Sequence, residues 1–335
     1  MLGGRGVWVP LAAFAAVGVA VFLVASRLAR HADAIADATG LGRAWVGVLL
    51  LAGSTSLPEL MTDINAAAVG AIDLGIGDLI GSTLTNMLIL AVLDLVYRRR
   101  NVLDSVSPHH ALVATLAMVL TAMLAAAIAS GGWGSFGHVG IESVLIVGVY
   151  LLGMRSVYLV SRPTAPPEQL VLGDTRRTVL RRGIAGFALG AAGLAVTAPL
   201  LVLSAEVLAV ESGTSTTFIG TLLVGFTTSF PEIAATIAAA RLGAFDLAVG
   251  NVLGSNAFNM CILLAMDLVY VRGPVLAQAS RVHVLTASLA VIAVGFSVMG
   301  ILARQGRVID RVRIESIAIV AIYGGAVWLL ARSVM

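Results

Sequence analysis

Two short stretches combine a proline, a glutamate and several hydroxyl groups inside otherwise apolar sequence. Residues 54–59 read Ser-Thr-Ser-Leu-Pro-Glu, and residues 227–232 read Thr-Thr-Ser-Phe-Pro-Glu. Proline lacks an N–H, so the carbonyl four residues before it loses its helical donor. Carboxylate, hydroxyl and carbonyl oxygens together form the ligand set that a hard cation prefers. Each stretch therefore has the chemistry of a cation site, centred on Glu59 or Glu232.

The simpler interpretation of one such stretch is a proline kink with a protonated glutamic acid. Its hydroxyl groups would then bond back to their own helix. An ionisable residue within a membrane is costly, however, and indicates a functional site by default. Non-helical backbone at membrane depth is tolerated where it lines a cavity or is buried in protein. Two matching copies in one chain favour the functional interpretation over two accidental kinks.

A second polar stretch follows each of the first two, at residues 77–86 and 250–259. On a helix, Ser82 and Asn86 are four residues apart and share a face, as do Ser255 and Asn259. Small residues here also suit close helix packing, whatever the function. An unpaired amide inside a membrane is expensive, so the two asparagines indicate more than packing.

The composition is that of a polytopic membrane protein. Hydrophobic residues make up 59% of the 335 residues, charged residues make up 12%, and the mean hydropathy is +1.00. A membrane-spanning helix needs about 20 apolar residues. Ten such spans are predicted, at residues 8–29, 43–69, 76–97, 109–129, 139–160, 183–209, 216–240, 249–270, 281–302 and 312–333. The first has no cleavage site after it and is expected to be retained.

The chain repeats itself at an offset of 173 residues. Pro58 and Glu59 recur as Pro231 and Glu232, and Asn86 recurs as Asn259. Five spans per copy is an odd number, so the second copy must be inverted in the membrane. The predicted fold is all-α, with ten transmembrane helices in two inverted five-helix repeats. These repeats occupy residues 1–160 and 183–335, and residues 161–182 form a short cytoplasmic connector.

The basic pI near 9.5 does not indicate nucleic-acid binding, because the arginines sort by membrane side. Arg5, Arg272, Arg281 and Arg332 fall on one side, and the other 17 of the 21 basic residues fall on the opposite side. The positive-inside rule then places both termini outside and the connector in the cytoplasm, with the chain in the cell (inner) membrane. The single Cys261 lies within a span, where packing is its expected role.

Together these motifs resemble the two alpha-repeats of the sodium/calcium exchanger superfamily, also called cation/calcium antiporters. The similarity covers all ten predicted spans. It implies a secondary active antiporter that exchanges Ca²⁺ for Na⁺ by alternating access. The transported ions and the lipid bilayer are the expected partners, with no enzymatic activity, no resident cofactor and no obligate protein partner.

The resemblance also implies a ligand set. Glu59 and Glu232 would be the central carboxylates, and Thr55 and Thr228 would contribute backbone carbonyls to the ion. The other implied ligands are the hydroxyls of Ser56, Ser229, Ser82 and Ser255, the amides of Asn86 and Asn259, and the carbonyls of Ala52 and Gly225 at flanking sodium sites.

The sequence departs from the family pattern at three places. Ser54 and Thr227 replace the glycine that usually precedes Thr-Ser, and Thr83 stands where the second copy has Asn256. The last motif position is asparagine in both copies, whereas several family members carry aspartate in one. That leaves two central carboxylates and no extra charge for a co-transported cation. In the family that this chain resembles, the aspartate variant is associated with potassium dependence, so the resemblance implies potassium independence.

Other polar residues receive structural roles. Asp63 is expected at the mouth of its span, and Asp78 is expected to cap a helix N-terminus. Asp94 and Asp267 are predicted to be solvated or paired with arginine, and Glu142 and Glu315 to lie in the first turns of their spans. His110 and His283 are expected at the membrane interface.

Three alternatives remain. The sequence Gly-Ile-Gly-Asp at residues 75–78 spells the motif of intramembrane aspartyl proteases, with Asp94 as the nearest partner aspartate. An ion channel is a second possibility, although broken helices in inverted repeats favour alternating access. The third alternative, a Ca²⁺/H⁺ or other divalent-cation exchanger on the same fold, is the hardest to separate from Na⁺ coupling. Two facing carboxylates would bind protons as well as sodium or calcium.

Overall fold

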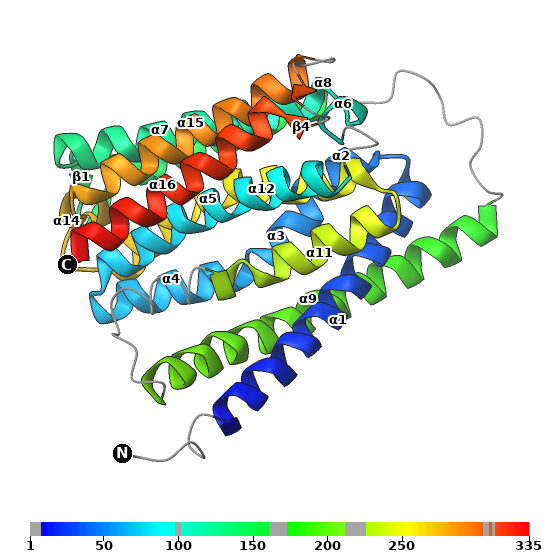
Figure 1. Cartoon of the computed structure of the whole chain (residues 1–335), viewed down its shortest axis with the longest axis horizontal. Coiled ribbons are helices and arrows are strands. Elements are labelled where there is room, and N and C mark those ends of the chain that lie inside the picture. The colour runs from blue at the N-terminus through cyan, green and yellow to red at the C-terminus, as the bar shows by residue number, and fades with distance from the viewer. Residues whose placement is uncertain are drawn as a thin grey trace.

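The computed structural model describes residues 8–97, 102–160, 173–211, 226–303, 308–309 and 312–334, and these are almost entirely helical (Figure 1). The elements of the first half are α1 (Trp8–Thr39), α2 (Arg43–Val46), the π-helix η1 (Gly47–Leu51), α3 (Ala52–Thr55), α4 (Leu57–Val69), α5 (Ile72–Val96), α6 (Val102–Ser105), α7 (His109–Ser130), β1 (Ser135–Phe136), β2 (Val139–Gly140) and α8 (Ile141–Val160). Those of the second half are α9 (Gly173–Glu211), α11 (Phe230–Arg241), α12 (Phe245–Asn259), α13 (Ile262–Val269), α14 (Val275–Gln278), α15 (Val282–Leu302), β3 (Val308–Ile309), β4 (Val312–Arg313) and α16 (Ile314–Val334).

Within the described residues, seven helices are long and apolar enough to cross a membrane. An eighth span forms if the bent pair Arg43–Thr55 and Leu57–Val69 crosses as one unit, and α16 contributes a shorter apolar stretch, Ile314–Leu329. The prediction of a multi-pass membrane protein is confirmed. The predicted span at 216–240 lies partly outside the described residues. Helices α12 and α13 together form one of the seven spans, Phe245–Val269, at the predicted position 249–270.

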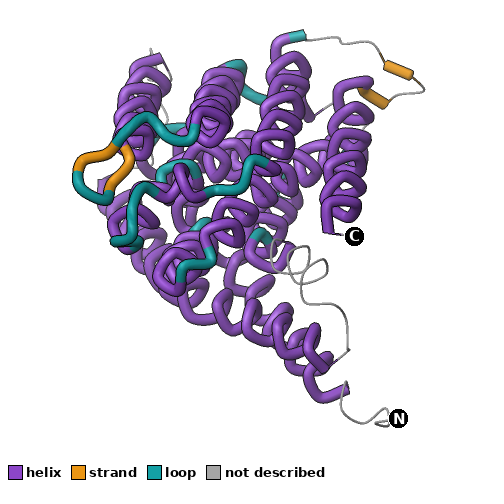
Figure 2. The backbone as a smooth tube through the Cα atoms, turned by 90° about the vertical axis from the view of Figure 1, so that its left-hand side faces the viewer, coloured by secondary structure: helices purple, strands orange, loops and turns teal. Residues whose placement is uncertain are grey.

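Helices α1 and α9 lie together along one side of the molecule, and α7, α8, α15 and α16 lie along the other (Figure 1). Figure 2 shows the same chain turned by 90°, with helices making up most of the fold. Glycines of α9 make the α1 contact close. A Cβ on Gly186 would lie 2.3 Å from the imidazole of His31, and one on Gly190 would lie 2.8 Å from the Leu28 side chain. Between these two outer groups lie α4, α5, α11 and α12, which carry the motifs (Figure 1).

Both proline motifs break a helix, as predicted, and each break lies two residues before the proline. Ser56 separates α3 from α4, with φ −82° and ψ 8°, and the two segments meet at a bend of 43°. Ser229 precedes α11 with nearly the same angles, φ −78° and ψ 3°. Proline then occupies the first turn of each new helix, where no N–H is required. The glutamate of each motif therefore lies in the first turn after a break.

Element boundaries recur at the offset seen in the sequence. Strands β1 and β2 begin at residues 135 and 139, and β3 and β4 begin 173 residues later, at 308 and 312. Helices α6 and α14 have the same relation, and glycines with positive φ end the turns that lead into α5 and α12, at Gly70 (φ 83°) and Gly243 (φ 76°). The repeated sequence thus produces repeated local structure.

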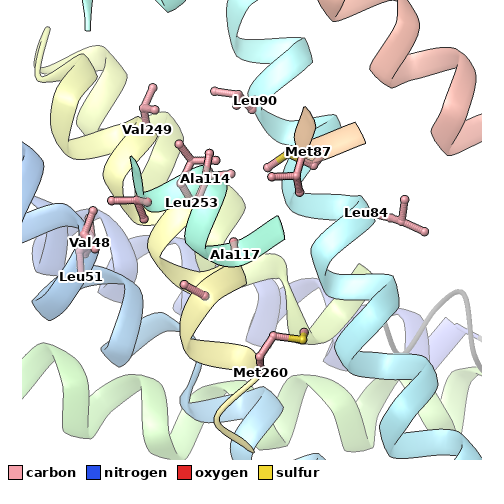
Figure 3. Close-up of a cluster of buried hydrophobic side chains, with 14 of the residues drawn as sticks. Val48, Leu51, Leu84, Met87, Leu90, Ala114, Ala117, Val249, Leu253 and Met260 are labelled. Carbon is pink, nitrogen blue, oxygen red and sulfur yellow. The ribbon is translucent and has the colours of Figure 1, made fainter. Parts of the chain in front are cut away.

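The apolar core joins the two halves of the chain. In Figure 3, Val48 and Leu51 of η1 approach Val249 and Leu253 of α12, and α5 contributes Met87 beside them. Glycines permit this approach: a Cβ on Gly250 would lie 2.8 Å from the Ala44 carbonyl oxygen, and one on Gly254 would lie 2.5 Å from that of Val48. Backbone contacts backbone here, so α12 holds the segment that leads into the first helix break.

Buried aspartates bond across the two halves. Asp94 accepts a hydrogen bond from Ser316 Oγ at 2.8 Å, and Asp267 accepts one from Ser143 Oγ. Both aspartates are at most 3% exposed, so the first of their two predicted states, solvation, was wrong, whereas pairing with arginine stays a prediction. They serve as acceptors for hydroxyl and backbone groups of neighbouring elements, which is how a buried carboxylate is commonly satisfied. Glu142 and Glu315 do lie in the first turns of their helices, as predicted.

The two histidines also pair across the halves. His110 Nε2 lies 3.0 Å from Asp246 Oδ1, and His283 Nε2 lies 3.2 Å from Asp73 Oδ1. His110 is 1% exposed and His283 is 12% exposed, and each lies in the first turn of its helix, at an end of a candidate span. Each pair joins the start of one helix to the start of a helix in the other half.

Replacing Asp267 by alanine is expected to destabilise the fold. The change removes the acceptor of Ser143 Oγ, Gly140 N and Val275 N, of which the last donates at 2.6 Å. Each buried donor left unsatisfied costs about 1–3 kcal/mol. The melting temperature in detergent should fall by several degrees. The same change at Asp37, whose side chain is 60% exposed, should leave it nearly unchanged. Equal melting temperatures for the two variants would contradict this role.

Candidate ion-binding site

The two glutamates of the proline motifs lie at the centre of a buried polar cluster that both halves share. Glu59 on α4 and Glu232 on α11 are each 0% exposed. Ser56 Oγ donates to Glu232 Oε1 at 3.2 Å, and Ser229 Oγ donates to Glu59 Oε1 at 3.5 Å. The hydroxyl at each helix break therefore bonds to the glutamate of the opposite half.

The serines of the second polar stretch complete the centre of this cluster. Ser255 Oγ on α12 donates to Glu232 Oε1 at 3.3 Å. Ser82 on α5 is reached by Ser229 Oγ at 3.2 Å. The equivalent serines thus lie beside the two helix breaks, as the shared helix face with Asn86 and Asn259 predicts.

The threonines of the motifs bond outward to the next turn of α5 and α12. Thr55 Oγ1 lies 3.1 Å from Asn251 Oδ1 and 3.2 Å from the carbonyl oxygen of Ala52. Thr228 Oγ1 donates to Asp78 Oδ1 at 3.0 Å. Asn251 and Asp78 occupy equivalent positions, so the two halves have the same contact with different charge.

The two motif asparagines differ in their partners. Asn86 Nδ2 donates to Asn256 Oδ1 at 2.8 Å. The position equivalent to Asn256 in the first half is Thr83, whose hydroxyl instead bonds to the Leu79 carbonyl oxygen of its own helix at 3.0 Å. Among the described residues, neither side-chain polar atom of Asn259 has a hydrogen-bond partner. The substitution at Thr83 thus removes the partner that symmetry would provide for Asn259.

Several buried oxygens of the motif residues have no hydrogen-bond donor in the described part of the chain. Those that belong to the predicted ligands are Glu59 Oε2, Glu232 Oε2, Asn86 Oδ1 and Asn259 Oδ1. Buried oxygen atoms normally have a partner. Carboxylate and amide oxygens that receive no hydrogen bond keep their lone pairs available. Such oxygens can coordinate a hard cation, which binds several oxygen ligands. No group of three or more His, Cys, Asp or Glu residues suited to a metal is found among the described residues. Neutral oxygens must therefore contribute much of any coordination shell.

Eleven of the twelve predicted ligands lie in the described structure, and Gly225 lies outside it. The structure places the side chains of the glutamates, threonines and serines in several small hydrogen-bonded groups around the two helix breaks. Ala52 is buried at their edge, where its carbonyl oxygen accepts from Thr55 and from the Ser56 N–H. The cluster also contains Asn251 and Asn256, which were not predicted as ligands. Their equivalence to Asp78 and Thr83 in the repeat is the signal that could have found them.

Two structural roles expected from the sequence were wrong. Asp78 is not a helix cap, because α5 begins at Ile72 and Asp78 lies in its interior, 3% exposed. Asp63 is not a mouth carboxylate, since it lies within α4 and is 0% exposed. Asp94 is the nearest partner aspartate for the protease interpretation, and it accepts a hydrogen bond from Ser316 Oγ.

Comparison with known proteins places this geometry in context. The family model described as "Sodium/calcium exchanger protein" matches residues 9–159 and again residues 182–332. The candidate antiporter CaxA of Alkalimonas amylolytica is 27% identical over 277 residues, which is 80% of this chain and 83% of CaxA. The inner membrane protein YrbG of Escherichia coli is 28% identical over 259 residues, 75% of this chain and 77% of YrbG.

A solved structure has the same fold. The sodium-calcium exchanger NCX_Mj, in crystals soaked with Na⁺ and Sr²⁺, superposes with a TM-score of 0.72 and 22% identity, covering 96% of this chain and 98% of that one. The family match covers most of the chain in two copies, and the helix breaks with their glutamates fall within both. This chain therefore belongs to the sodium/calcium exchanger protein family, a family of antiporters.

Proposed function

We propose that this protein is a secondary active antiporter that exchanges Ca²⁺ for Na⁺ by alternating access. The observation that carries the proposal is the set of buried oxygens without donors at the centre of the two broken helices, contributed by both halves. Glu59 and Glu232 would supply the charge that neutralises one divalent ion. Two carboxylates that share a small cavity repel each other when it is empty, so the cavity should bind either Ca²⁺ or the competing monovalent ions.

The remaining ligands would follow the family pattern. Thr55 and Thr228 would offer backbone carbonyls, and Ser56, Ser82, Ser229 and Ser255 their hydroxyls. Asn86 and Asn259 would offer amide oxygens, and Ala52 and Gly225 would offer carbonyls to flanking sodium sites. Ca²⁺ and Na⁺ are cargo in this scheme, so no resident cofactor is needed.

The proposed architecture is ten helices in two inverted halves, residues 1–160 and 183–335, joined by 161–182. The recurrence of element boundaries at 173 residues supports it, as does the reciprocal bonding of Ser56 with Glu232 and Ser229 with Glu59. Helix α9 already begins at Gly173, within the connector. Arginine distribution supports an inner-membrane location with both termini outside.

Exchange rather than leakage requires a coupling rule. The free energy of moving two uncompensated carboxylates through the low-dielectric interior is prohibitive. We propose that the site changes its side of access only when cations neutralise Glu59 and Glu232. After the site releases one ion species, it must bind the other before it can change its side of access again. This requirement couples the two fluxes.

Radioactive Ca²⁺ uptake into proteoliposomes tests the proposal. Vesicles that hold the purified protein would be given an outward Na⁺ gradient in one arm and an outward proton gradient in the other. Uptake driven by Na⁺ alone is the expected result. Uptake driven only by protons would identify the Ca²⁺/H⁺ alternative, to which the two donor-free carboxylate oxygens are equally suited. Uptake in neither arm would show that Ca²⁺ is the wrong substrate.

A further inference from the structure

A second pair of buried carboxylates lies beside the proposed exchange site, in the first half only. Asp63 on α4 is 0% exposed and Asp78 on α5 is 3% exposed. The two carboxyl groups are close enough to interact with each other by charge. Asp63 packs against the face of α5 that carries Gly75 and Asp78, because its Oδ1 lies 3.5 Å from where a Cβ on Gly75 would be. A buried acidic pair therefore joins α4 and α5.

Little in the surrounding structure offsets this negative charge. Thr228 Oγ1 donates to Asp78 Oδ1 at 3.0 Å. The other three carboxylate oxygens, Asp63 Oδ1, Asp63 Oδ2 and Asp78 Oδ2, have no hydrogen-bond partner among the described residues. Buried charges are normally paired or coordinate a metal, since an isolated one is very costly. Asp63 thus points an unpartnered carboxylate at a second one, inside a membrane segment.

In the second half of the chain, the positions equivalent to Asp63 and Asp78 carry uncharged residues that need no bound cation. Thr236 and Asn251 are the repeat equivalents of Asp63 and Asp78. Asn251 Nδ2 donates to Thr236 Oγ1 at 3.1 Å and lies 3.4 Å from the Glu232 carbonyl oxygen. That pair is neutral and bonds to itself. When both aspartates are ionised, the acidic pair has only acceptors and cannot do this, so the difference between the halves is one of charge and of donors.

We propose that Asp63 and Asp78, together with the Thr228 hydroxyl, form an additional monovalent-cation site that binds Na⁺. The choice of Na⁺ rests on the proposed exchange function. Three free carboxylate oxygens and one hydroxyl are few ligands for Ca²⁺, which takes 6–8 oxygens. Glu59 is close enough for charge interactions with both aspartates, so an ion here also feels the central ion. Repulsion between two divalent ions would be twice that between a divalent and a monovalent one at the same distance.

This site changes the charge count made from the motifs alone. Asparagine at both final motif positions leaves two central carboxylates, but the structure places Asp63 and Asp78 beside them. Four buried carboxylates can then be balanced by more positive charge than one Ca²⁺ supplies. The extra capacity lies on the first half, so the two halves of the site are not equivalent for monovalent ions.

The second half provides the matched variant for a test. The double substitution Asp63→Thr, Asp78→Asn converts the acidic pair into the neutral pair already present at Thr236 and Asn251. Equilibrium binding of radioactive Na⁺ to purified protein without Ca²⁺ should fall by one ion per chain in this variant. Binding of one Ca²⁺ ion per chain without Na⁺ should persist, because the central glutamates are unchanged, and Asp37→Asn should alter neither ion count.

Glu59→Gln separates this inference from the proposed function. It should lose Ca²⁺ binding while keeping the Na⁺ ion held by Asp63 and Asp78. An unchanged Na⁺ count in the double variant would overturn the site, including the case in which the pair holds only a proton. Loss of a Ca²⁺ ion instead of a Na⁺ ion would also overturn it, by showing a divalent site. If the double variant does not fold, Asp63→Asn, which keeps the side-chain shape, should show the same loss of one Na⁺.

Discussion

Glu59→Gln should reduce Ca²⁺ uptake at least about 100-fold, and Glu232→Gln should do the same. Here the pair of opposite charges is a glutamate and the bound cation. Removing one partner of such a buried pair costs about 2–5 kcal/mol, and every 1.4 kcal/mol is tenfold in affinity. Both glutamates are fully buried, and each is bonded by the serine at the opposite helix break. Glutamine keeps the shape but removes the negative charge and places an amide N–H₂ where an ion would bind. Uptake driven by a Na⁺ gradient is the measurement.

The control for this pair is Glu142→Gln. Glu142 is equally buried, but it lies in the first turn of α8 and accepts a hydrogen bond from the Trp133 N–H at 3.2 Å, away from the cluster. The same chemical change there should leave uptake near the unmodified level. Transport that survives in one glutamate variant and not in the other would contradict an equal contribution from the two halves.

Gly254→Ala should reduce transport strongly without changing any predicted ligand. A Cβ at this position would lie 2.5 Å from the Val48 carbonyl oxygen, 2.7 Å from Val48 Cα and 2.9 Å from Ala52 Cβ. Two of these atoms are backbone, so η1 and α3 must move away from α12. Overpacking of this kind costs typically about 1–3 kcal/mol, and misplacement by about 1 Å can cost about 100-fold in function. Thr55 and Ser56 would move with α3.

Gly53→Ala is the matched control, because nothing lies within 4 Å of a Cβ at Gly53, one residue after Ala52 on the same helix. That variant should transport and melt like the unmodified protein. Ca²⁺ uptake and melting temperature in detergent measure the two effects. Normal uptake by Gly254→Ala would show that the close approach of α12 to η1 does not position the site.

The sequence alone predicted most of the local structure. The proline in each motif predicted a break, and the breaks occur at Ser56 and Ser229. The spacing of four residues between Ser82 and Asn86 predicted that both share one helix face. The apolar stretches predicted membrane-spanning helices. These features depend on contacts within about one helical turn, which the local residues control. The repeat at 173 residues also carried over into the element boundaries.

The family could be recognised from the doubled motif, and the family match is consistent with it. Roles inferred from position alone were less secure. Asp78 reads as a helix cap only if its helix begins near it, whereas α5 begins six residues earlier, at Ile72. Asp63, Asp94 and Asp267 read as exposed because charged side chains seldom lie buried without partners. Their surroundings come from elements far away in the chain.

What the sequence by itself determined is therefore the membrane class, the repeat, the helix breaks and the residue types that can bind a cation. Only the tertiary structure decided which groups meet. Ser56 bonds to Glu232, Thr228 bonds to Asp78, and His110 lies against Asp246, all across more than 130 residues of chain. Such pairings depend on how the two halves of the chain pack against each other. Helix periodicity carries no information about this packing. The acidic pair of Asp63 and Asp78 became visible only when α4 and α5 were placed side by side.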